Sequence, residues 1–257
     1  MPRRPAIRPR ILVLALVAAL GVYAAFTTWA DHRRMALVGL TERPCGADGQ
    51  VVTGRPLDDW ATLCGYREEN RRMIAAGIRP GVVMIGDSLT AAWPRASLER
   101  QIVTRGVGGQ ASGQVLLRFR QDALALRPRI IHIWVGTNDI AGLTGPVALD
   151  QITANLLDMV ELARAHGIKV IVGTVPPARD FKGFRLGDPA PDIARLNALL
   201  RHLSSRRGLV LADYHAALLR PDGTVRKALF MEDGIHLTAA GYEALRPVLT
   251  EALAKAS

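Results

Sequence analysis

Four short segments of this sequence carry groups that could take part in acyl transfer. Gly86-Asp87-Ser88-Leu89 supplies a hydroxyl, Gly106-Val107-Gly108-Gly109 supplies backbone amides, and Gly136-Thr137-Asn138-Asp139 supplies a side-chain amide. Asp233-Gly234-Ile235-His236 supplies an acid three residues before a histidine. Each segment alone is weak evidence, because glycine-rich and Asn-Asp turns are common in loops. Together, they contain the groups that ester hydrolysis requires.

Ester hydrolysis by a serine needs a base, an acid and donors for an oxyanion. The Ser88 hydroxyl is a poor nucleophile until a base takes its proton. His236 can take that proton if Asp233 holds its tautomer and stabilises the imidazolium. Backbone N–H groups of Ser88 and Gly109 and the Asn138 side chain would stabilise the oxyanion. The sequence therefore predicts Ser88, Asp233 and His236 as catalytic residues, and Ser88, Gly109 and Asn138 as the oxyanion hole.

Six histidines compete for the role of base. His215 is the main rival, because it follows Asp213 near the end of an expected strand. His132 lies inside an apolar run and is expected in the core. The spacing from Asp233 and the position just before the last expected helix favour His236.

Motifs for other chemistries are missing or incomplete. An α/β-hydrolase nucleophile turn has the pattern Gly-x-Ser-x-Gly, but Thr90 stands at its last position. The sequence has no HExxH motif, no pair of CxxC motifs and no Walker loop, so we expect neither a metal nor a nucleotide cofactor. Asp87 and Asp139 adjoin the candidate residues and are expected to accept hydrogen bonds that order the loops.

Apolar runs that alternate with amphipathic stretches predict the elements that hold these segments. Strands are expected at Val82–Ile85, Ile102–Val107, Ile130–Val135, Lys169–Val175 and Leu209–Ala212. Helices are expected at Ser112–Leu126, Pro146–His166, Asp192–Arg207 and Thr238–Ala254, with Pro146 in the first turn and Thr238 as an N-cap. Continuous apolar strands between helices are typical of a parallel sheet in a three-layer α/β sandwich. Ligands of such folds bind beyond the carboxyl ends of the strands, where the polar segments lie.

The four segments, in this order, resemble those of the SGNH hydrolases, also called GDSL esterases/lipases. The resemblance covers about residues 82–255. By this resemblance Ser88 matches the nucleophile, Gly109 and Asn138 match the oxyanion residues, and Asp233 and His236 match the acid and the base. The resemblance implies a flavodoxin-like parallel sheet and hydrolysis of esters or thioesters without a metal or other cofactor.

One departure from the family pattern is visible at Thr104-Arg105, where the second segment often begins with asparagine. We expect it to affect a loop contact rather than catalysis. Val175-Pro176-Pro177-Ala178 and Pro189-Ala190-Pro191 resemble the bacterial lysophospholipase- and arylesterase-like members. Phe181 and Phe184 either line an acyl pocket or lie on an exposed loop.

The sequence thus predicts a serine hydrolase that acts through an acyl-enzyme on short-chain acyl esters or lysophospholipid-like substrates. An acyl (acetyl) transferase or deacetylase acting on cell-envelope glycans would use the same residues. A catalytically silent binding module on this fold is a third alternative, which the filled catalytic positions disfavour. Short connections between the elements predict a shallow, open site that prefers short acyl groups.

The N-terminus is interpreted as a targeting segment. Arginines at positions 3, 4, 8 and 10 precede Ile11–Ala30, which has no charged residue. Such a run can span a bilayer of about 30 Å as a helix. The arginines indicate that the rest of the chain lies outside the cytoplasm. A signal peptide cleaved near Thr28-Trp29-Ala30, which would give a secreted protein, is the alternative. We divide the chain into an anchor or signal peptide (1–30), an N-terminal extension (31–80) and a hydrolase domain (81–257).

Charge and cysteine content exclude two further classes. The net charge of +10 falls to 29 − 23 = +6 without residues 1–30, and the remaining basic residues are dispersed. This pattern argues against a nucleic-acid partner. Cys45 and Cys64 are the only cysteines, too few for a disulfide-built fold or a Cys-rich zinc module. Outside the cytoplasm they are expected to pair, which would stabilise the fold by about 3 kcal/mol; two free thiols are the alternative.

Overall fold

The computed structural model describes residues 18, 20–30, 45–46, 59–99, 101–181, 183–185 and 187–257. The chain forms two compact units, residues 1–55 and 56–257. In the first unit, residues 20–30 form a helix. Within the described residues, no helix combines the length and apolar character needed to cross a membrane. Residues 11–17 and 19 of the predicted anchor lie outside the described residues, as does most of the predicted extension before residue 59.

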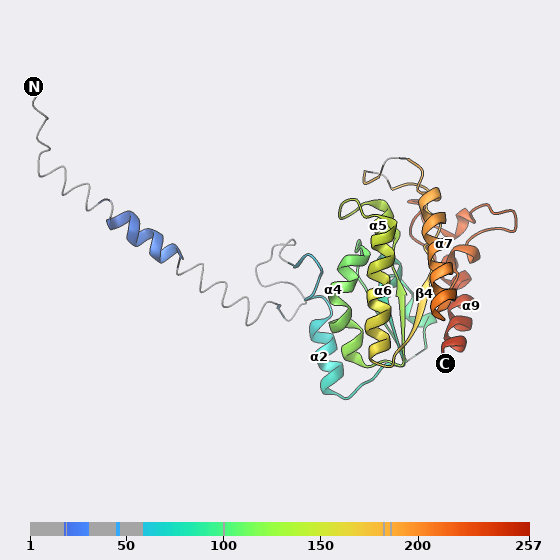
Figure 1. Cartoon of the computed structure of the whole chain (residues 1–257), viewed down its shortest axis with the longest axis horizontal. Helices are drawn as coiled ribbons and strands as arrows, with labels where there is room; N and C mark the ends of the chain where they lie inside the picture. The colour runs from blue at the N-terminus through green and yellow to red at the C-terminus, as the bar shows by residue number, and fades with distance from the viewer. Residues whose placement is uncertain are drawn as a thin grey trace, which may run out of the picture. The chain divides into compact units, whose positions relative to one another are not determined.

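The second unit contains a five-stranded parallel sheet, as the sequence predicts (Figure 1). Its strands are β1 (Val82–Gly86), β2 (Ile102–Gly106), β3 (Ile130–Trp134), β4 (Lys169–Gly173) and β5 (Val210–Ala212). They lie in the order β2-β1-β3-β4-β5, and every neighbouring pair is parallel. β4 ends two residues earlier than predicted, because the Val175 N–H turns away and donates to the Asn197 side chain at 2.8 Å.

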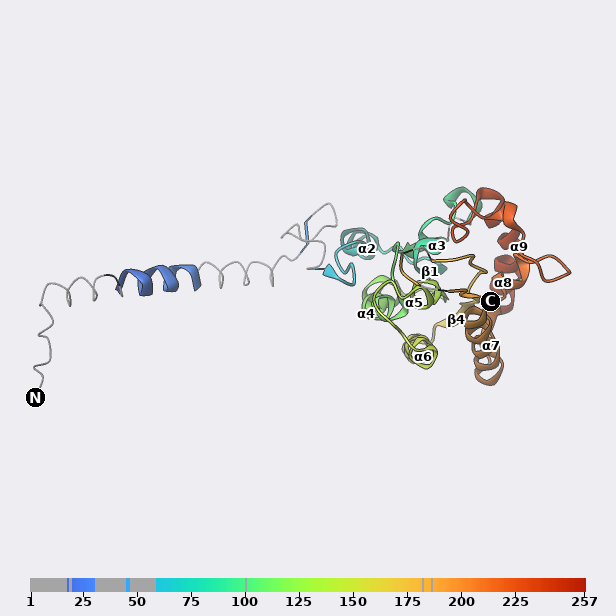
Figure 2. The same ribbon diagram turned by 90° about the horizontal axis from the view of Figure 1, so that it is seen from above.

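Helices cover both faces of the sheet, which makes the predicted three-layer sandwich (Figure 2). The helices are α2 (Arg67–Ala75), α3 (Ser88–Ala91), α4 (Ser112–Asp122), α5 (Thr137–Ala141), α6 (Leu149–Ala165), α7 (Ala190–Arg207), α8 (Tyr214–Ala217) and α9 (Ala239–Ala256). Successive strand residues point to opposite faces. Val83 and Ile85 therefore pack in one buried cluster with residues of α4, α6 and α7. Met84 packs in a second cluster with residues of α3, α8 and α9.

The helix boundaries agree with the sequence at some ends and differ at others. Thr238 is the N-cap of α9, as predicted, and its hydroxyl accepts a hydrogen bond from the Gly241 N–H at 3.2 Å. Pro146 lies outside α6, so its predicted place in the first turn is wrong. The reason is the preceding turn, in which the Gly145 N–H donates to the Gly142 carbonyl, and the extended backbone of Ala148, which is the N-cap of α6. α4 ends at Asp122 and is followed by a 3-10 turn, Leu124–Leu126.

The region before β1 contains α2 and the second cysteine. Met73 of α2 packs against the cluster that contains Val83 and Ile85. Cys64 is buried. Cys45 and Cys64 are both disulfide-bonded, so the alternative of free thiols is wrong.

Candidate active site

All five predicted site residues meet at the carboxyl edge of the sheet. Ser88 follows β1 as the first residue of α3, Gly109 follows β2, and Asn138 follows β3 in α5. Because β1 lies between β2 and β3, these three loops are neighbours. The segment before α9 brings Asp233 and His236 to the same place, and all five residues line one pocket.

Ser88, His236 and Asp233 form a continuous chain of hydrogen bonds. His236 Nε2 lies 3.0 Å from Ser88 Oγ, and His236 Nδ1 lies 2.6 Å from Asp233 Oδ2. A carboxylate can only accept, so Nδ1 carries the proton and Nε2 is free to accept from the serine hydroxyl. The arrangement can move the hydroxyl proton to the imidazole while the carboxylate stabilises the resulting cation.

Local backbone bonds hold the carboxylate of Asp233 in place. Its Oδ1 accepts from the N–H groups of Ile235 and His236, both at 2.9 Å. Partial burial would raise the pKa of Asp233, but the bonds from the His236 ring and from these two N–H groups outweigh it and lower the pKa. Gly234 makes the turn at φ +69°, where a Cβ would lie 2.8 Å from Arg179 Cβ. Gly234 therefore allows the tight turn that brings the Asp233 carboxylate to the His236 ring three residues later.

The turn that presents Ser88 is tightly packed. Asp87 is the N-cap of α3, and its carboxylate accepts from the Leu89 N–H at 2.9 Å. Burial raises the pKa of Asp87 to about 7, because it disfavours the charged form. A Cβ on Gly86 would lie 2.1 Å from the Trp134 carbonyl oxygen. Asp87 thus orders the loop, as predicted.

The residues of the predicted oxyanion hole line the same pocket. Gly109 has φ +76°, and within the described residues neither its N–H nor that of Ser88 donates a hydrogen bond. Asn138 Nδ2 donates to the Gln110 carbonyl at 3.0 Å and lies 3.4 Å from Asp87 Oδ2. The contact with Asp87 is long, so the amide hydrogen that points toward Asp87 is available to donate to a ligand instead.

The pocket over these residues has a volume of about 680 Å³. Its apolar wall includes Leu143, Phe181, Phe184 and Ile235. Phe181 is buried, whereas Phe184 is 62% exposed at the mouth. Both phenylalanines line the pocket, so the interpretation of the loop as merely solvent-exposed is wrong for Phe181.

The rival histidine has other partners. His215 Nδ1 lies 3.0 Å from the Val175 carbonyl oxygen. The Asp213 carboxylate accepts two bonds from the Arg201 guanidinium, at 3.0 and 3.1 Å. Neither His215 nor Asp213 lines the pocket of Ser88. His132 is buried in the core, as predicted, and burial lowers its pKa to about 3.

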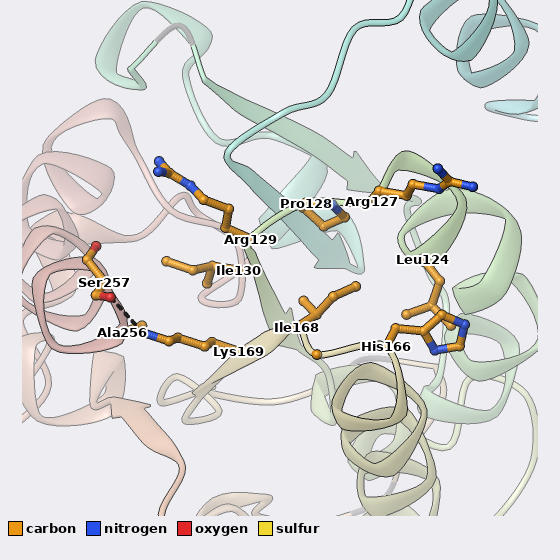
Figure 3. A pocket seen from close by; sticks show the side chains of 11 residues that line it. Leu124, Arg127, Pro128, Arg129, Ile130, His166, Ile168, Lys169, Ala256 and Ser257 are labelled. Atoms are coloured by element: carbon orange, nitrogen blue, oxygen red, sulfur yellow. Dashed lines mark hydrogen bonds between the residues drawn. The ribbon is translucent and has the colours of Figure 1, made fainter.

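A second pocket, of about 530 Å³, lies at the opposite, amino edge of the sheet (Figure 3). It is lined by the basic side chains of Arg127, Arg129, His166 and Lys169. These do not converge: Figure 3 shows Arg127 and Arg129 pointing apart. Lys169 Nζ donates to the Ser257 carbonyl at 2.6 Å. Among the residues that the structure describes, no three His, Cys, Asp or Glu side chains gather as metal ligands would.

Sequence reasoning missed the buried polar residues behind the site. Arg118 and Asp122 of α4 are fully buried and paired at 3.2 Å. A signal was available, because Val115, Arg118, Phe119 and Asp122 follow the spacing of a buried helix face. Charged residues on such a face need internal partners.

The chain is a three-layer α/β sandwich with a serine, a histidine and an aspartate in hydrogen-bond contact at the carboxyl edge of its parallel sheet, an arrangement typical of serine hydrolases. Residues 84–244 match the family model of the GDSL-like Lipase/Acylhydrolase family. The chain therefore belongs to this family, as its resemblance to the SGNH hydrolases implied, and is an esterase-type hydrolase.

Relatives of known structure or name support this assignment. A GDSL-like lipase from Bacteroides thetaiotaomicron is 32% identical, with a TM-score of 0.70 over 77% of this chain and 100% of that chain. Platelet-activating factor acetylhydrolase IB subunit alpha1 from Bos taurus is 28% identical over 63% of this chain and 70% of that protein. The uncharacterized lipoprotein YqeF from Bacillus subtilis is 38% identical over 85 residues, which are 32% of this chain and only 35% of the relative's length.

Proposed function

We propose that the protein hydrolyses carboxylic esters or thioesters through an acyl-enzyme on Ser88. The observation that carries the proposal is the chain of bonds from Ser88 Oγ through His236 to Asp233, at 3.0 and 2.6 Å. In this proposal Ser88 is the nucleophile, His236 the general base and Asp233 the group that orients it.

The reaction has two halves. In the first, His236 Nε2 takes the Ser88 proton while Oγ attacks the carbonyl carbon, and the N–H groups of Ser88 and Gly109 and the Asn138 amide stabilise the oxyanion. His236 then protonates the leaving alcohol. In the second half, His236 takes a proton from a water molecule as its oxygen attacks the acyl carbon. The bond from that carbon to Ser88 Oγ then breaks, His236 returns the proton to Oγ, and the carboxylic acid is released.

We further propose that the acyl group is short, with lysophospholipid-like esters as a second substrate class. Phe184, in the apolar wall of the pocket, is 62% exposed, so a long chain laid along this wall would keep part of its surface in water. Each buried methylene is worth about 0.8 kcal/mol, so an enclosed chain site would show rising affinity with length. The bovine relative is named as an acetylhydrolase.

Acyl length is tested with p-nitrophenyl acetate, butyrate, octanoate and palmitate. We expect kcat/KM to peak at acetate or butyrate. A kcat/KM that climbs steadily to palmitate would contradict the short-acyl proposal and indicate a long acyl groove.

Acyl transfer to, or deacetylation of, a cell-envelope glycan is the second candidate. It is favoured by the exposure of the acid–base pair, since the side chains of His236 and Asp233 are 39% and 42% exposed. An acyl-enzyme at such a site is open to a large hydroxyl acceptor or donor. Product analysis with and without a glycan acceptor separates transfer from hydrolysis.

We propose that the hydrolase domain works outside the cytoplasm, on the periplasmic side, tethered by residues 11–30, with secretion after signal-peptide cleavage as the alternative. The charge-free run, the disulfide-bonded cysteines and a relative named as a lipoprotein support this location. A reporter that matures only outside the cytoplasm should be active when fused after Ser257. Activity of a reporter that works only in the cytoplasm would contradict this.

The nucleophile is tested with Ser88→Ala and a fluorophosphonate probe. We expect the probe to label the wild type and not Ser88→Ala, and kcat to fall by about a million-fold. Ser205→Ala, at an exposed position on α7, is the matched control and should behave as the wild type. Turnover near the wild-type level in folded Ser88→Ala would overturn the assignment.

A further inference from the structure

Arg118 donates three hydrogen bonds to two segments that carry the candidate site, the end of β1 before Ser88 and the end of β2 with the Gly109 loop that follows it. Its side chain is fully buried, on the inner face of α4. The guanidinium donates to the Gly86 carbonyl at 2.8 Å, to the Arg105 carbonyl at 2.7 Å and to Gln110 Oε1 at 2.6 Å. It also pairs with Asp122 at 3.2 Å. Three of these four acceptors lie at the ends of β1 and β2 and in the loop after β2.

The contacts with Gly86 and Gln110 lead directly to groups of the proposed reaction, and the contact with Arg105 holds the end of β2, from which the Gly109 loop starts. The Gly86 carbonyl lies two residues before Ser88, and Gln110 directly follows Gly109. The Gln110 carbonyl accepts from Asn138 Nδ2 at 3.0 Å, so the loop held by Arg118 also holds the third oxyanion donor. The nucleophile and the three donors are thus fixed relative to one buried cation.

A guanidinium suits this task better than another buried group. It presents five N–H donors in a planar, fixed fork, whereas a lysine offers a single flexible ammonium. Burying a charge costs several kcal/mol unless its partners are well placed. Burial lowers the pKa of Arg118, and Asp122 beside it offsets this in part. Asp122 can balance the charge, but it does not account for the three bonds to the loops.

We propose that Arg118 is a positioning residue for acyl transfer. It holds the Ser88 turn and the Gly109 loop in register, so that the nucleophile and the oxyanion donors face the same substrate atom. The proposal rests on the proposed function of Ser88, Gly109 and Asn138. Arg118 itself does not line the pocket, so in this proposal it acts through the loops that it holds and not on the substrate.

Arg105 is a matched control in the same protein. Its side chain is also fully buried and bonds to Glu69 at 3.2 Å, Asn70 Oδ1 at 2.8 Å and its neighbour's carbonyl at 2.9 Å. It also lies over the Tyr66 ring. None of these side-chain partners lines the pocket. Loss of the Arg105 side chain therefore removes a buried guanidinium without directly removing a bond to the site loops; its links to them are indirect, through the Tyr66 hydroxyl on the Gly106 carbonyl and through Asn70 on Asp122.

The test compares Arg118→Lys and Arg118→Met with Arg105→Lys and Arg105→Met in the full chain. We measure Tm, and then kcat and KM with p-nitrophenyl acetate well below each Tm. All four variants should be less stable. The Arg118 variants should lose about 100-fold in kcat, comparable to the loss of one oxyanion donor, with KM changed by less than about threefold. The Arg105 variants should keep kcat within about threefold of the wild type.

A purely structural role would give the same kcat per folded molecule in both pairs, and this result would overturn the proposal. If the Arg118 variants do not fold, Gln110→Met removes one bond to the guanidinium with little change of side-chain volume. It should lower kcat by about tenfold, and an unchanged kcat would also overturn the proposal. Ser88→Ala separates the two levels: if it retains turnover, the proposed function fails, whereas unchanged kcat at Arg118 alone refutes only the positioning role.

Discussion

Two pairs of an aspartate and a nearby histidine lie in the described part of the hydrolase unit, one directly after β5 and one just before α9. The histidine of the second pair contacts a serine, Ser88, whereas that of the first contacts a backbone carbonyl. Asp233 and His236 are three residues apart, with the carboxylate 2.6 Å from Nδ1. Asp213 and His215 are two residues apart near β5, yet the carboxylate binds Arg201 and the imidazole Nδ1 contacts the Val175 carbonyl. The residue types are the same, but the competing partners differ.

The difference shows that a nearby arginine or backbone N–H can occupy a carboxylate that would otherwise bond to the neighbouring histidine. Asp213 is the N-cap of α8 and lies beside Arg201 of α7. Burial would raise the pKa of Asp213, but the Arg201 bonds and the cap N–H of Ala216 lower it. Asp233 has no arginine bonded to it in the described residues, so its second oxygen is left for His236.

The two pairs should differ most in kcat when their histidines are replaced. His236→Ala should reduce kcat by about a million-fold, as loss of the base does in serine hydrolases. His215→Ala should leave kcat within a few-fold of the wild type, because its ring does not reach the pocket. Steady-state hydrolysis of p-nitrophenyl acetate measures both. Loss of activity in His215→Ala with activity retained in His236→Ala would reverse the assignment.

Replacing each acid should give a smaller but still separable effect. Asp233→Asn should lower kcat by about ten-thousand-fold, because the amide no longer selects the imidazole tautomer. Asp213→Asn should leave kcat unchanged and cost about 1 kcal/mol of unfolding free energy through the lost bonds to Arg201. Kinetics and urea unfolding of both variants provide the test. Equal kinetic losses would mean that both acids serve the reaction.

The turn between acid and histidine can be tested through its glycine. Gly234→Ala forces a Cβ into the left-handed region, 2.8 Å from Arg179 Cβ, and should shift Asp233. We expect kcat to fall by about tenfold, because small misplacements of catalytic groups are costly. Gly223→Ala, at φ +82° with no atom within 4 Å of the added Cβ, carries the same backbone strain and is the control. A control that lost as much kcat would assign the effect to strain alone.

The smallest effect is expected at the Arg201–Asp213 pair. Both side chains are partly exposed, so Arg201→Gln should cost only about 0.5 kcal/mol at pH 7. The folded-state pKa of Asp213 is lowered, so the pair stabilises the fold above pH of about 4 and this stability is lost as the pH falls through that pKa. Urea unfolding at several pH values should show the difference between variant and wild type vanish in acid. If the difference in unfolding free energy between Arg201→Gln and the wild type grew as the pH fell, the predicted direction of the pH dependence would be wrong.

The parts of the fold that follow from local sequence were predictable. Buried strands are continuous apolar runs, and the segments that follow β1, β2 and β3 meet because parallel strands share one edge. The N-cap Thr238 was predictable because a hydroxyl before an apolar helix caps it locally. The prediction for Pro146 is wrong, because a proline suits the first turn of a helix and an extended segment equally well.

Long-range partners were not predictable. The contact of Asp213 with Arg201 depends on how α7 packs beside β5, and no local pattern carries it. The same holds for Arg118, whose acceptors are carbonyl groups on two strands and an amide in a loop. Its burial was readable from the helix spacing, but its partners were not.

The separation of Ser88 and His236 along the chain, 148 residues, has a consequence for biosynthesis. The nucleophile and the oxyanion loops come from the first three strands, whereas the proposed base precedes the last helix, α9. A chain still emerging from the ribosome, or one in which α9 has not yet docked, holds a serine without its base. On the proposed mechanism, esterase activity therefore arises only once α9 has docked, and an unfinished chain does not hydrolyse esters.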